Sequence, residues 1–212
     1  MSNHDLRKAL VDRTRQSRVR LAPTQLDALT DYLTLLTKWN AKINLTSLPL
    51  RPPSDETWSR LIIEPLLAAE HIVDDGRAWI DVGSGGGSPG IPIKIARPAV
   101  ALVMVEARER KAAFLREAVR SLFLEPARVE ADTFERVADR YPASFSVATA
   151  RAVRIDRAFQ EAARRALTPD GTLLLFSNQG DAPELMGFSR PSVVPIGASA
   201  VLLSYGIVPR GT

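Results

Sequence analysis

Apolar residues recur at helical spacing along the first third of the chain, where they predict helices. A stripe of five predicts an amphipathic helix whose apolar face packs against the rest of the protein. Its members are Leu26, Leu29, Leu33, Leu36 and Trp39. A short helix is expected over residues 6–11. Another is expected from Trp58 to Ile72, with a kink or restart at Pro65, because proline lacks the N–H of an interior helical residue.

From Trp79 onward the pattern changes to short apolar runs that alternate with helical segments. The runs have the length of strands and lie at residues 78–82, 100–105, 127–130, 145–149 and 172–176. Helices are expected at 91–96, 109–123, 134–138 and 155–167, a turn at 169–171, and a closing pair of strands at 192–196 and 200–205. This alternation predicts an α/β fold with a mostly parallel, doubly wound sheet over residues 76–212, preceded by a helical extension over residues 1–75.

Composition narrows the class of protein without identifying it. The 212 residues are 45% hydrophobic and 25% charged, as is typical of a globular chain, and they include no cysteine, which excludes disulfides, thiolate metal sites and cysteine nucleophiles. No run approaches the roughly 18 apolar residues of a membrane span, and residues 1–8 lack the apolar core of a signal peptide. We therefore expect a cytoplasmic protein with no membrane contact.

Positive charge is concentrated at the start of the chain. The net charge is +4, and residues 1–20 hold six basic and two acidic residues, so the whole excess lies in this segment. Such an arm is typical of a segment that contacts a polyanion such as RNA. The alternative is a solvated helix face in an arginine-rich proteome. The candidate RNA-binding residues are Arg7, Lys8, Arg13, Arg15, Arg18 and Arg20.

The most informative stretch joins the first expected strand to a helix through a run of glycines, residues 80–92. Glycines let a loop adopt positive φ and bring backbone N–H groups close to a nucleotide-like ligand. The dinucleotide fingerprint would need glycine at 83, 85 and 88, but position 88 is Ser88. The string instead reads Asp-x-Gly-x-Gly-x-Gly from Asp81 to Gly87. This form suits S-adenosylmethionine, whose ammonium Asp81 is expected to hold directly or through water. A tight turn without a ligand is the alternative.

Other candidate contacts lie where further strands end, at the edge where doubly wound sheets bind ligands. Glu106 follows an apolar strand and is expected to accept the two ribose hydroxyls. Glu135 is a candidate acceptor for the adenine amino group, with Phe134 against the ring, although a solvated helix acid is an equal alternative. Arg151 is a candidate to bind the cofactor carboxylate or an RNA phosphate, with a structural salt bridge as the alternative.

Three motifs together resemble the RsmG (GidB) family of bacterial small-subunit ribosomal RNA methyltransferases. They are Trp39-Asn-x-x-Ile-Asn44-Leu-Thr46, Asp81-Val-Gly-Ser-Gly-Gly-Gly-x-Pro-Gly-Ile-Pro92 and Ala150-Arg-Ala-Val153. The likeness runs from about residue 25 to 180. It implies a Rossmann-like class I methyltransferase fold and S-adenosylmethionine-dependent methylation of a guanosine N7 in 16S rRNA, so that the partner is 16S rRNA or the small ribosomal subunit.

The resemblance also implies roles for individual residues. Gly83, Gly85, Gly87 and Ser88 would belong to the cofactor loop, with Gly83 and Ser88 flanking the methionine end. Phe134-Glu135 would hold the adenine, and Arg151 would be a further cofactor contact. Because guanine N7 offers a lone pair and has no proton to lose, catalysis is expected to be positional, with Arg151 and Asp81 supporting the geometry. We expect no metal site, since the only histidines, His4 and His71, form no ligand-like pair. We also expect a monomer.

This chain departs from the family pattern at four places. Ser88 stands where the family usually has a large apolar residue, and Thr133 where it has a basic one. A His-x-x-Asp-Ser string is replaced by residues 61–65, Leu-Ile-Ile-Glu-Pro, and a Lys-Gly pair by residues 179–180, Gln-Gly. The alternatives are a methyltransferase acting on another RNA, a protein or a small molecule, and a ribosome- or RNA-binding relic without catalysis. Ser88 and the missing histidine or tyrosine catalyst disfavour a nicotinamide dehydrogenase.

Overall fold

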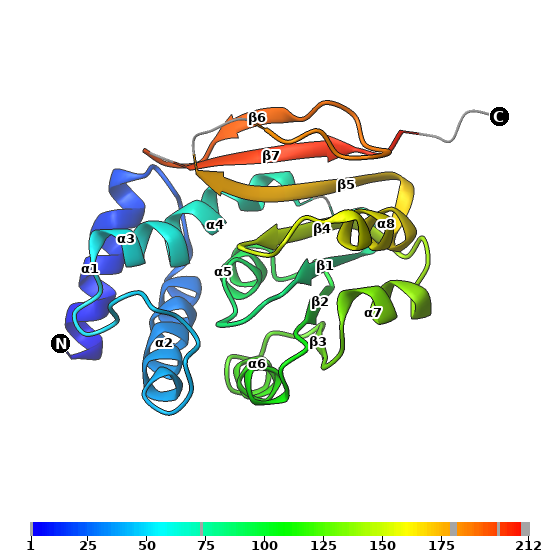
Figure 1. The fold of residues 1–212 in the computed structure, drawn as a ribbon. Helices are drawn as coiled ribbons and strands as arrows, with labels where there is room; N and C mark the ends of the chain where they lie inside the picture. The colour runs from blue at the N-terminus through cyan, green and yellow to red at the C-terminus, as the bar shows by residue number, and fades with distance from the viewer. Residues whose placement is uncertain (1, 73, 179–181, 199, 209–212) are drawn as a thin grey trace.

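The computed structural model describes residues 2–72, 74–178, 182–198 and 200–208. Its helices precede and then alternate with the strands of one sheet (Figure 1). The helices are α1 (Asn3–Gln16), α2 (Pro23–Asn40), α3 (Asp55–Trp58), the π-helical turn η1 (Ser59–Ile63), α4 (Glu64–Ala68), the 3₁₀ turn η2 (Ala69–His71), α5 (Gly90–Ala96), α6 (Glu109–Ser121), α7 (Phe134–Arg140) and α8 (Arg157–Ala166). The strands are β1 (Ala78–Val82), β2 (Leu102–Val105), β3 (Ala127–Glu130), β4 (Phe145–Arg151), β5 (Leu167–Asn178), β6 (Ser192–Pro195) and β7 (Ala200–Gly206).

The seven strands lie in the order β3-β2-β1-β4-β5-β7-β6. The first five are parallel, whereas β7 runs antiparallel to both β5 and β6. The predicted mostly parallel, doubly wound sheet and its closing pair of strands are therefore confirmed. The order reverses between β1 and β4, which makes the carboxyl ends of these two strands the switch point where such folds bind ligands.

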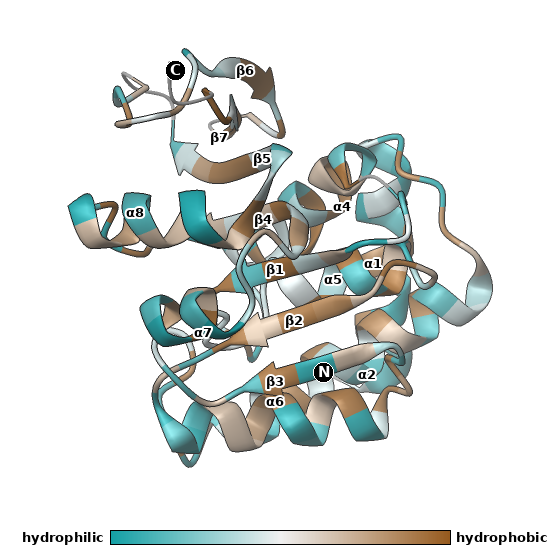
Figure 2. Ribbon diagram, turned by 90° about the vertical axis from the view of Figure 1, so that its right-hand side faces the viewer, coloured by the Kyte–Doolittle hydropathy of each residue, from teal (hydrophilic) through white to brown (hydrophobic). Residues whose placement is uncertain are grey.

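Side chains that alternate along the strands build two cores, one on each face of the sheet. Trp79 and Met104 face the core that α2, α4, α5 and α6 cover, while Ile80 and Val103 face the core under α7 and α8. Figure 2 shows β1 and β2 mostly brown along their length, as expected for central strands with both faces covered. The first core includes Leu29 of α2, so the N-terminal helices pack directly on the sheet.

Two elements differ from their expected form. The expected turn at residues 169–171 lies inside β5, where the register jumps from Phe145 opposite Leu167 to Val147 opposite Thr172. The extra residues form an excursion that Arg77 holds through bonds of 2.8 and 3.1 Å to the Asp170 carboxylate. The expected helix from Trp58 begins earlier, at Asp55, and winds into a π-helical turn before α4, so the predicted restart lies at Glu64, one residue before Pro65.

The remaining predicted elements are present with ends shifted by a few residues. Among the residues that the structure describes, no helix is long and apolar enough to cross a membrane. The boundary between an extension and a sheet domain near residue 75 stays a prediction.

Candidate functional site

The glycine loop lies where expected, between β1 and α5. Gly83, Gly85 and Gly87 have φ of 70°, 51° and 88°, in the left-handed region that favours glycine. A Cβ added at Gly83 would lie 2.5 Å from the Val153 Cγ1, and one at Gly87 would lie 2.4 Å from the Ile91 Cδ1. The loop thus needs glycine for its backbone conformation and for close packing, and the glycines carry no side chains that would cover its backbone.

Two neighbouring side chains hold this loop in place. The Tyr32 hydroxyl of α2 donates to the Gly86 carbonyl at 2.7 Å, and the Gly85 N–H donates to Glu106 Oε2 at 3.0 Å. The other carboxylate oxygen of Glu106 accepts from the Arg108 N–H at 2.9 Å, and the side chain is largely buried. Glu106 therefore supports the loop from the end of β2, beside the position where a ribose contact is predicted.

Asp81 is completely buried beneath the loop. Its Oδ1 accepts from the Thr149 hydroxyl at 2.6 Å, and Thr149 in turn accepts from the Trp79 indole at 2.9 Å. Its Oδ2 has no partner within the described part of the chain and would lie 2.8 Å from a Cβ at Gly90. Burial raises the pKa of Asp81 to about 6, against the lowering effect of the Thr149 bond. A contact with the cofactor ammonium stays a prediction, since the structure places this carboxylate below the loop surface.

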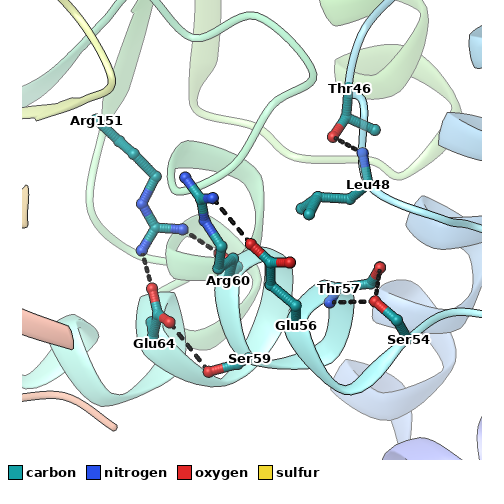
Figure 3. Close-up of polar contacts among 9 residues, drawn as sticks. All are labelled: Thr46, Leu48, Ser54, Glu56, Thr57, Ser59, Arg60, Glu64 and Arg151. Atoms are coloured by element: carbon teal, nitrogen blue, oxygen red, sulfur yellow. Dashed lines mark hydrogen bonds and ion pairs between the residues drawn. The ribbon is translucent and has the colours of Figure 1, made fainter. Parts of the chain in front are cut away.

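Arg151 ends β4 and joins the sheet to the N-terminal helices (Figure 3). Its guanidinium donates to Glu64 Oε2 at 2.6 Å and to the Arg60 carbonyl, and it stacks 4.3 Å above the Phe176 ring. Glu64 Oε1 accepts from the Ser59 hydroxyl at 3.0 Å. Burial lowers the pKa of Arg151 to about 10, opposed by the charge of Glu64. The salt bridge considered as the alternative is thus present, and Arg151 also lines the cleft described next.

The cleft beside the glycine loop has a volume of about 260 Å³. It brings together four of the predicted site residues, Gly83, Gly85, Ser88 and Arg151. The remaining predicted cofactor residues, Asp81, Gly87, Glu106, Phe134 and Glu135, lie outside its lining. Asp81, Gly87 and Glu106 nevertheless shape the loop from behind or within it.

Several lining residues were not predicted as site residues. They include the segment Thr46-Ser47-Leu48, Arg60 of η1, Lys111 of α6 and Ala152 after β4. The segment is held by Asn40, whose side-chain carbonyl accepts from the Leu45 and Thr46 N–H groups at 2.8 and 2.9 Å. The motif Trp39-Asn-x-x-Ile-Asn44-Leu-Thr46 contains both Asn40 and Thr46, so it is the sequence signal that could have located this segment. Nothing in the sequence pattern marks Lys111.

The predicted adenine pair lies at the start of α7. The Phe134 side chain is 6% exposed and packs against Phe159, with ring centroids 5.4 Å apart, so the ring belongs to the core under α7 and α8. Glu135 is half-buried in the first turn of the helix. The contacts of Phe134 and Glu135 with adenine stay predictions. Residues 179–180, the Gln-Gly departure, lie outside the described residues.

The basic arm forms α1 and the turn that leads into α2. Arg7 pairs with Asp27 at 2.5 Å, and Arg13 pairs with Asp55 at 2.5 Å and lies over the Trp58 ring, so these two serve packing between helices. The other four basic residues, which we call the arm cluster, are exposed: Lys8, Arg15, Arg18 and Arg20. Three of them, the arginines, line a hollow of about 510 Å³ at the α1–α2 turn.

Comparison with known proteins places this site in a family. The family model of rRNA small subunit methyltransferase G (GidB) matches residues 25–193, which is most of the chain. The chain belongs to this family. A ribosomal RNA small subunit methyltransferase G of Cupriavidus necator is 36% identical over 164 residues, covering 73% of this chain and 68% of that protein. The protein of the same name from Paracoccus denitrificans is 37% identical over 155 residues, covering 73% and 77%.

Solved structures confirm the fold of this GidB family member. A SAM-dependent methyltransferase from Aquifex aeolicus superposes with a TM-score of 0.60 at 15% identity, covering 73% of this chain and 94% of that one. A variant of MtNAS in complex with S-adenosylmethionine gives a TM-score of 0.61 at 17% identity, covering 89% and 80%. The predicted family and the predicted class I methyltransferase fold are therefore both confirmed.

Proposed function

We propose that this chain transfers a methyl group from S-adenosylmethionine to N7 of a guanosine in the 16S rRNA of the small ribosomal subunit. Family membership supports the class of reaction, and the cleft fits an acceptor atom that has no proton to lose. The cleft is lined by the glycine loop and by Arg60, Lys111 and Arg151, and its described lining includes no aspartate, glutamate or histidine. This is the observation that carries the proposal, because an attacking group that must lose a proton would need a base there.

The glycine loop fits the cofactor because it lies at the carboxyl end of β1 and its three positive-φ glycines have no side chains to keep a ligand away from the backbone. Gly83, Gly85 and Ser88 are proposed to contact its methionine end. Asp81 and Glu106 support the loop from below and beside it, and Glu135 is proposed to face the adenine. When bound, the cofactor supplies an electrophilic methyl group on a sulfonium.

The work left to the protein is alignment. Guanine N7 attacks with its own lone pair, so the residues of the cleft need only hold N7 in line with the methyl–sulfur bond and exclude water, which raises the rate by orientation. Arg151 is proposed to act in this positional way, since its ion pair with Glu64, at 2.6 Å, and its stacking on Phe176 leave it little freedom. The cations of the cleft are suited to the cofactor carboxylate and to RNA phosphates.

The arm cluster is proposed as a second RNA contact. The Gln25 side chain, near the start of α2, bonds the Ile95 and Ala96 carbonyls at the end of α5, whereas Tyr32, further along α2, bonds the glycine loop. The α1–α2 turn therefore lies at the opposite end of α2 from the cleft, roughly 15–20 Å away at 1.5 Å per residue. A substrate that reaches both sites must be extended, as ribosomal RNA is.

Methylation of small ribosomal subunits tests the proposal. Subunits from cells that lack this gene are incubated with the protein and labelled cofactor, and N7-methylguanosine is mapped in 16S rRNA. The Gly85→Ala variant should lose activity because Gly85 lines the cleft and an added Cβ there would lie 4.0 Å from Glu106 Oε2. Gly76→Ala is the matched control, because Gly76 also has positive φ, 78°, but an added Cβ there meets nothing within 4 Å.

Two results would contradict the proposal. Label on another atom or another RNA would show that the target is wrong. Subunits that stay unlabelled while the protein binds the cofactor would indicate a binding protein without this catalysis.

A further inference from the structure

The π-helical turn η1 leaves two backbone carbonyls without their usual helical donors. In a regular helix the Arg60 carbonyl would accept from the Glu64 N–H and the Leu61 carbonyl from residue 65. Here the Glu64 N–H donates to Ser59 O, one residue further back, and residue 65 is Pro65, which has no N–H. The π-helical turn therefore frees the Arg60 carbonyl, and Pro65 leaves the Leu61 carbonyl without its regular helical donor.

Both carbonyls are taken up by residues of the cleft. The Ser88 hydroxyl, at the end of the glycine loop, donates to the Leu61 carbonyl at 3.1 Å and lies 3.4 Å from the Arg60 carbonyl. The Arg151 guanidinium donates to the Arg60 carbonyl. Glu64, the residue just before Pro65, then accepts from Arg151 as well. Two parts of the cofactor site are thus tied to one turn of the N-terminal helices.

We propose that Pro65 and Ser88 are positioning residues for cofactor binding: proline at 65 leaves the Leu61 carbonyl free to dock the glycine loop through Ser88, beside the Arg60 carbonyl that orients Arg151. Pro65 lies outside the cleft lining, so Pro65→Ala tests the docking role apart from the direct cofactor contact proposed for Ser88. Proline at 65 and serine at 88 belong together, because the hydroxyl at 88 is the partner of a carbonyl that proline leaves free. The inference deepens the proposed function by naming what sets the shape of its cofactor site.

Replacing Pro65 by alanine separates this role from a purely structural one. Alanine restores an N–H at position 65, which competes with the Ser88 hydroxyl for the Leu61 carbonyl. The helix gains a backbone bond, and the melting temperature of the unliganded protein should stay the same or rise. The glycine loop loses its docking point, and S-adenosylmethionine should bind about fivefold more weakly, the effect of one net hydrogen bond.

The experiment is a calorimetric titration with S-adenosylmethionine in the absence of RNA, alongside thermal melts and amide exchange of residues 83–88. Because no RNA is present, its outcome is independent of whether the proposed rRNA target is right. Ser88→Ala should weaken binding as much as Pro65→Ala, and the double variant should be no weaker than either single variant. Ser88→Thr, which keeps the hydroxyl, should bind close to wild type. Pro169→Ala, at an exposed proline of β5, is the matched control.

Supporting results are weaker cofactor binding together with faster amide exchange in the glycine loop, at an unchanged or higher melting temperature. The inference is overturned if Pro65→Ala or Ser88→Ala binds the cofactor as tightly as the wild type. It is also overturned if the two effects add fully in the double variant. Should Pro65→Ala fail to fold, comparing Ser88→Ala with Ser88→Thr still tests the inference. Equal cofactor binding by these two variants would show that the hydroxyl at position 88 does not contribute, and the inference would be overturned.

Discussion

Asp81→Asn is predicted to stabilise the unliganded protein in a strongly pH-dependent way. Asp81 is fully buried, one of its carboxylate oxygens has no partner within the described residues, and its pKa is raised from 3.8 to about 6. An acid whose pKa is higher in the folded than in the unfolded state binds its proton more tightly when folded. Its contribution to stability is therefore greatest below about pH 4 and is lost as the pH rises to about 6.

The magnitude follows from the size of the shift. A rise of about two units corresponds to about 3 kcal/mol of unfolding free energy at about 1.4 kcal/mol per unit. Asparagine keeps an oxygen for the Thr149 hydroxyl but carries no charge to bury. Relative to wild type, Asp81→Asn should therefore gain about 3 kcal/mol of unfolding free energy when the pH is raised from 4 to 8.

Urea unfolding of the unliganded proteins at several pH values from 4 to 8 measures this difference. Asp31→Asn, at an exposed position of α2, should show no such change and controls for the loss of one negative charge. A difference between Asp81→Asn and wild type that is the same at pH 4 and pH 8 would refute the reasoning. If the carboxylate also holds the cofactor ammonium, Asp81→Asn should bind S-adenosylmethionine more weakly despite its greater stability.

Three further predictions concern other parts of the chain. Arg151→Ala should lower the unfolding free energy by about 3–5 kcal/mol, because it leaves the buried Glu64 without its cationic partner. Adding Glu64→Gln should restore most of this loss in urea unfolding, and no recovery would contradict the reasoning. Glutamine at all four arm-cluster positions should reduce the slope of log binding constant against log salt concentration for RNA by up to about four, and it should leave cofactor affinity unchanged. Changing the paired Arg7 and Arg13 should instead affect stability. Phe123→Gly should raise stability by about 0.5–1 kcal/mol in thermal melts, because Phe123 is 88% exposed with φ of 53°; a loss would reveal a contact made by the ring.

Local periodicity predicted most of the fold. The apolar runs located the strands, and the glycine string located the loop, because both signals depend on neighbouring residues and on backbone requirements that one stretch of sequence carries by itself. The same reasoning placed Arg151 at the end of a strand and Glu106 beside the loop. Register was less predictable: the 169–171 segment lies within β5, where it contacts Arg77, a residue far away in the sequence.

The parts of the site that were missed depend on pairings between remote segments. Arg151 and Glu64 are 87 residues apart, and neither position reveals the other until the helices pack on the sheet. The packing of Phe134 against Phe159 of α8 is likewise a contact between remote segments, and the predicted contact of Phe134 with adenine stays a prediction. Charge counting likewise overestimated the free cations of the arm, since Arg7 and Arg13 have acidic partners on other helices.

The shared core of the N-terminal helices and the sheet has a consequence for how the protein folds. Leu29 and Leu33 of α2 belong to the same buried cluster as Trp79 and Met104 of the sheet. Cutting the chain near residue 75 would uncover this apolar face, so a fragment that begins there should be prone to aggregation instead of folding as an independent domain. Helices and sheet should melt together in one cooperative transition, and a cofactor bound at the glycine loop should protect α1 and α2 from proteolysis as effectively as it protects the strands.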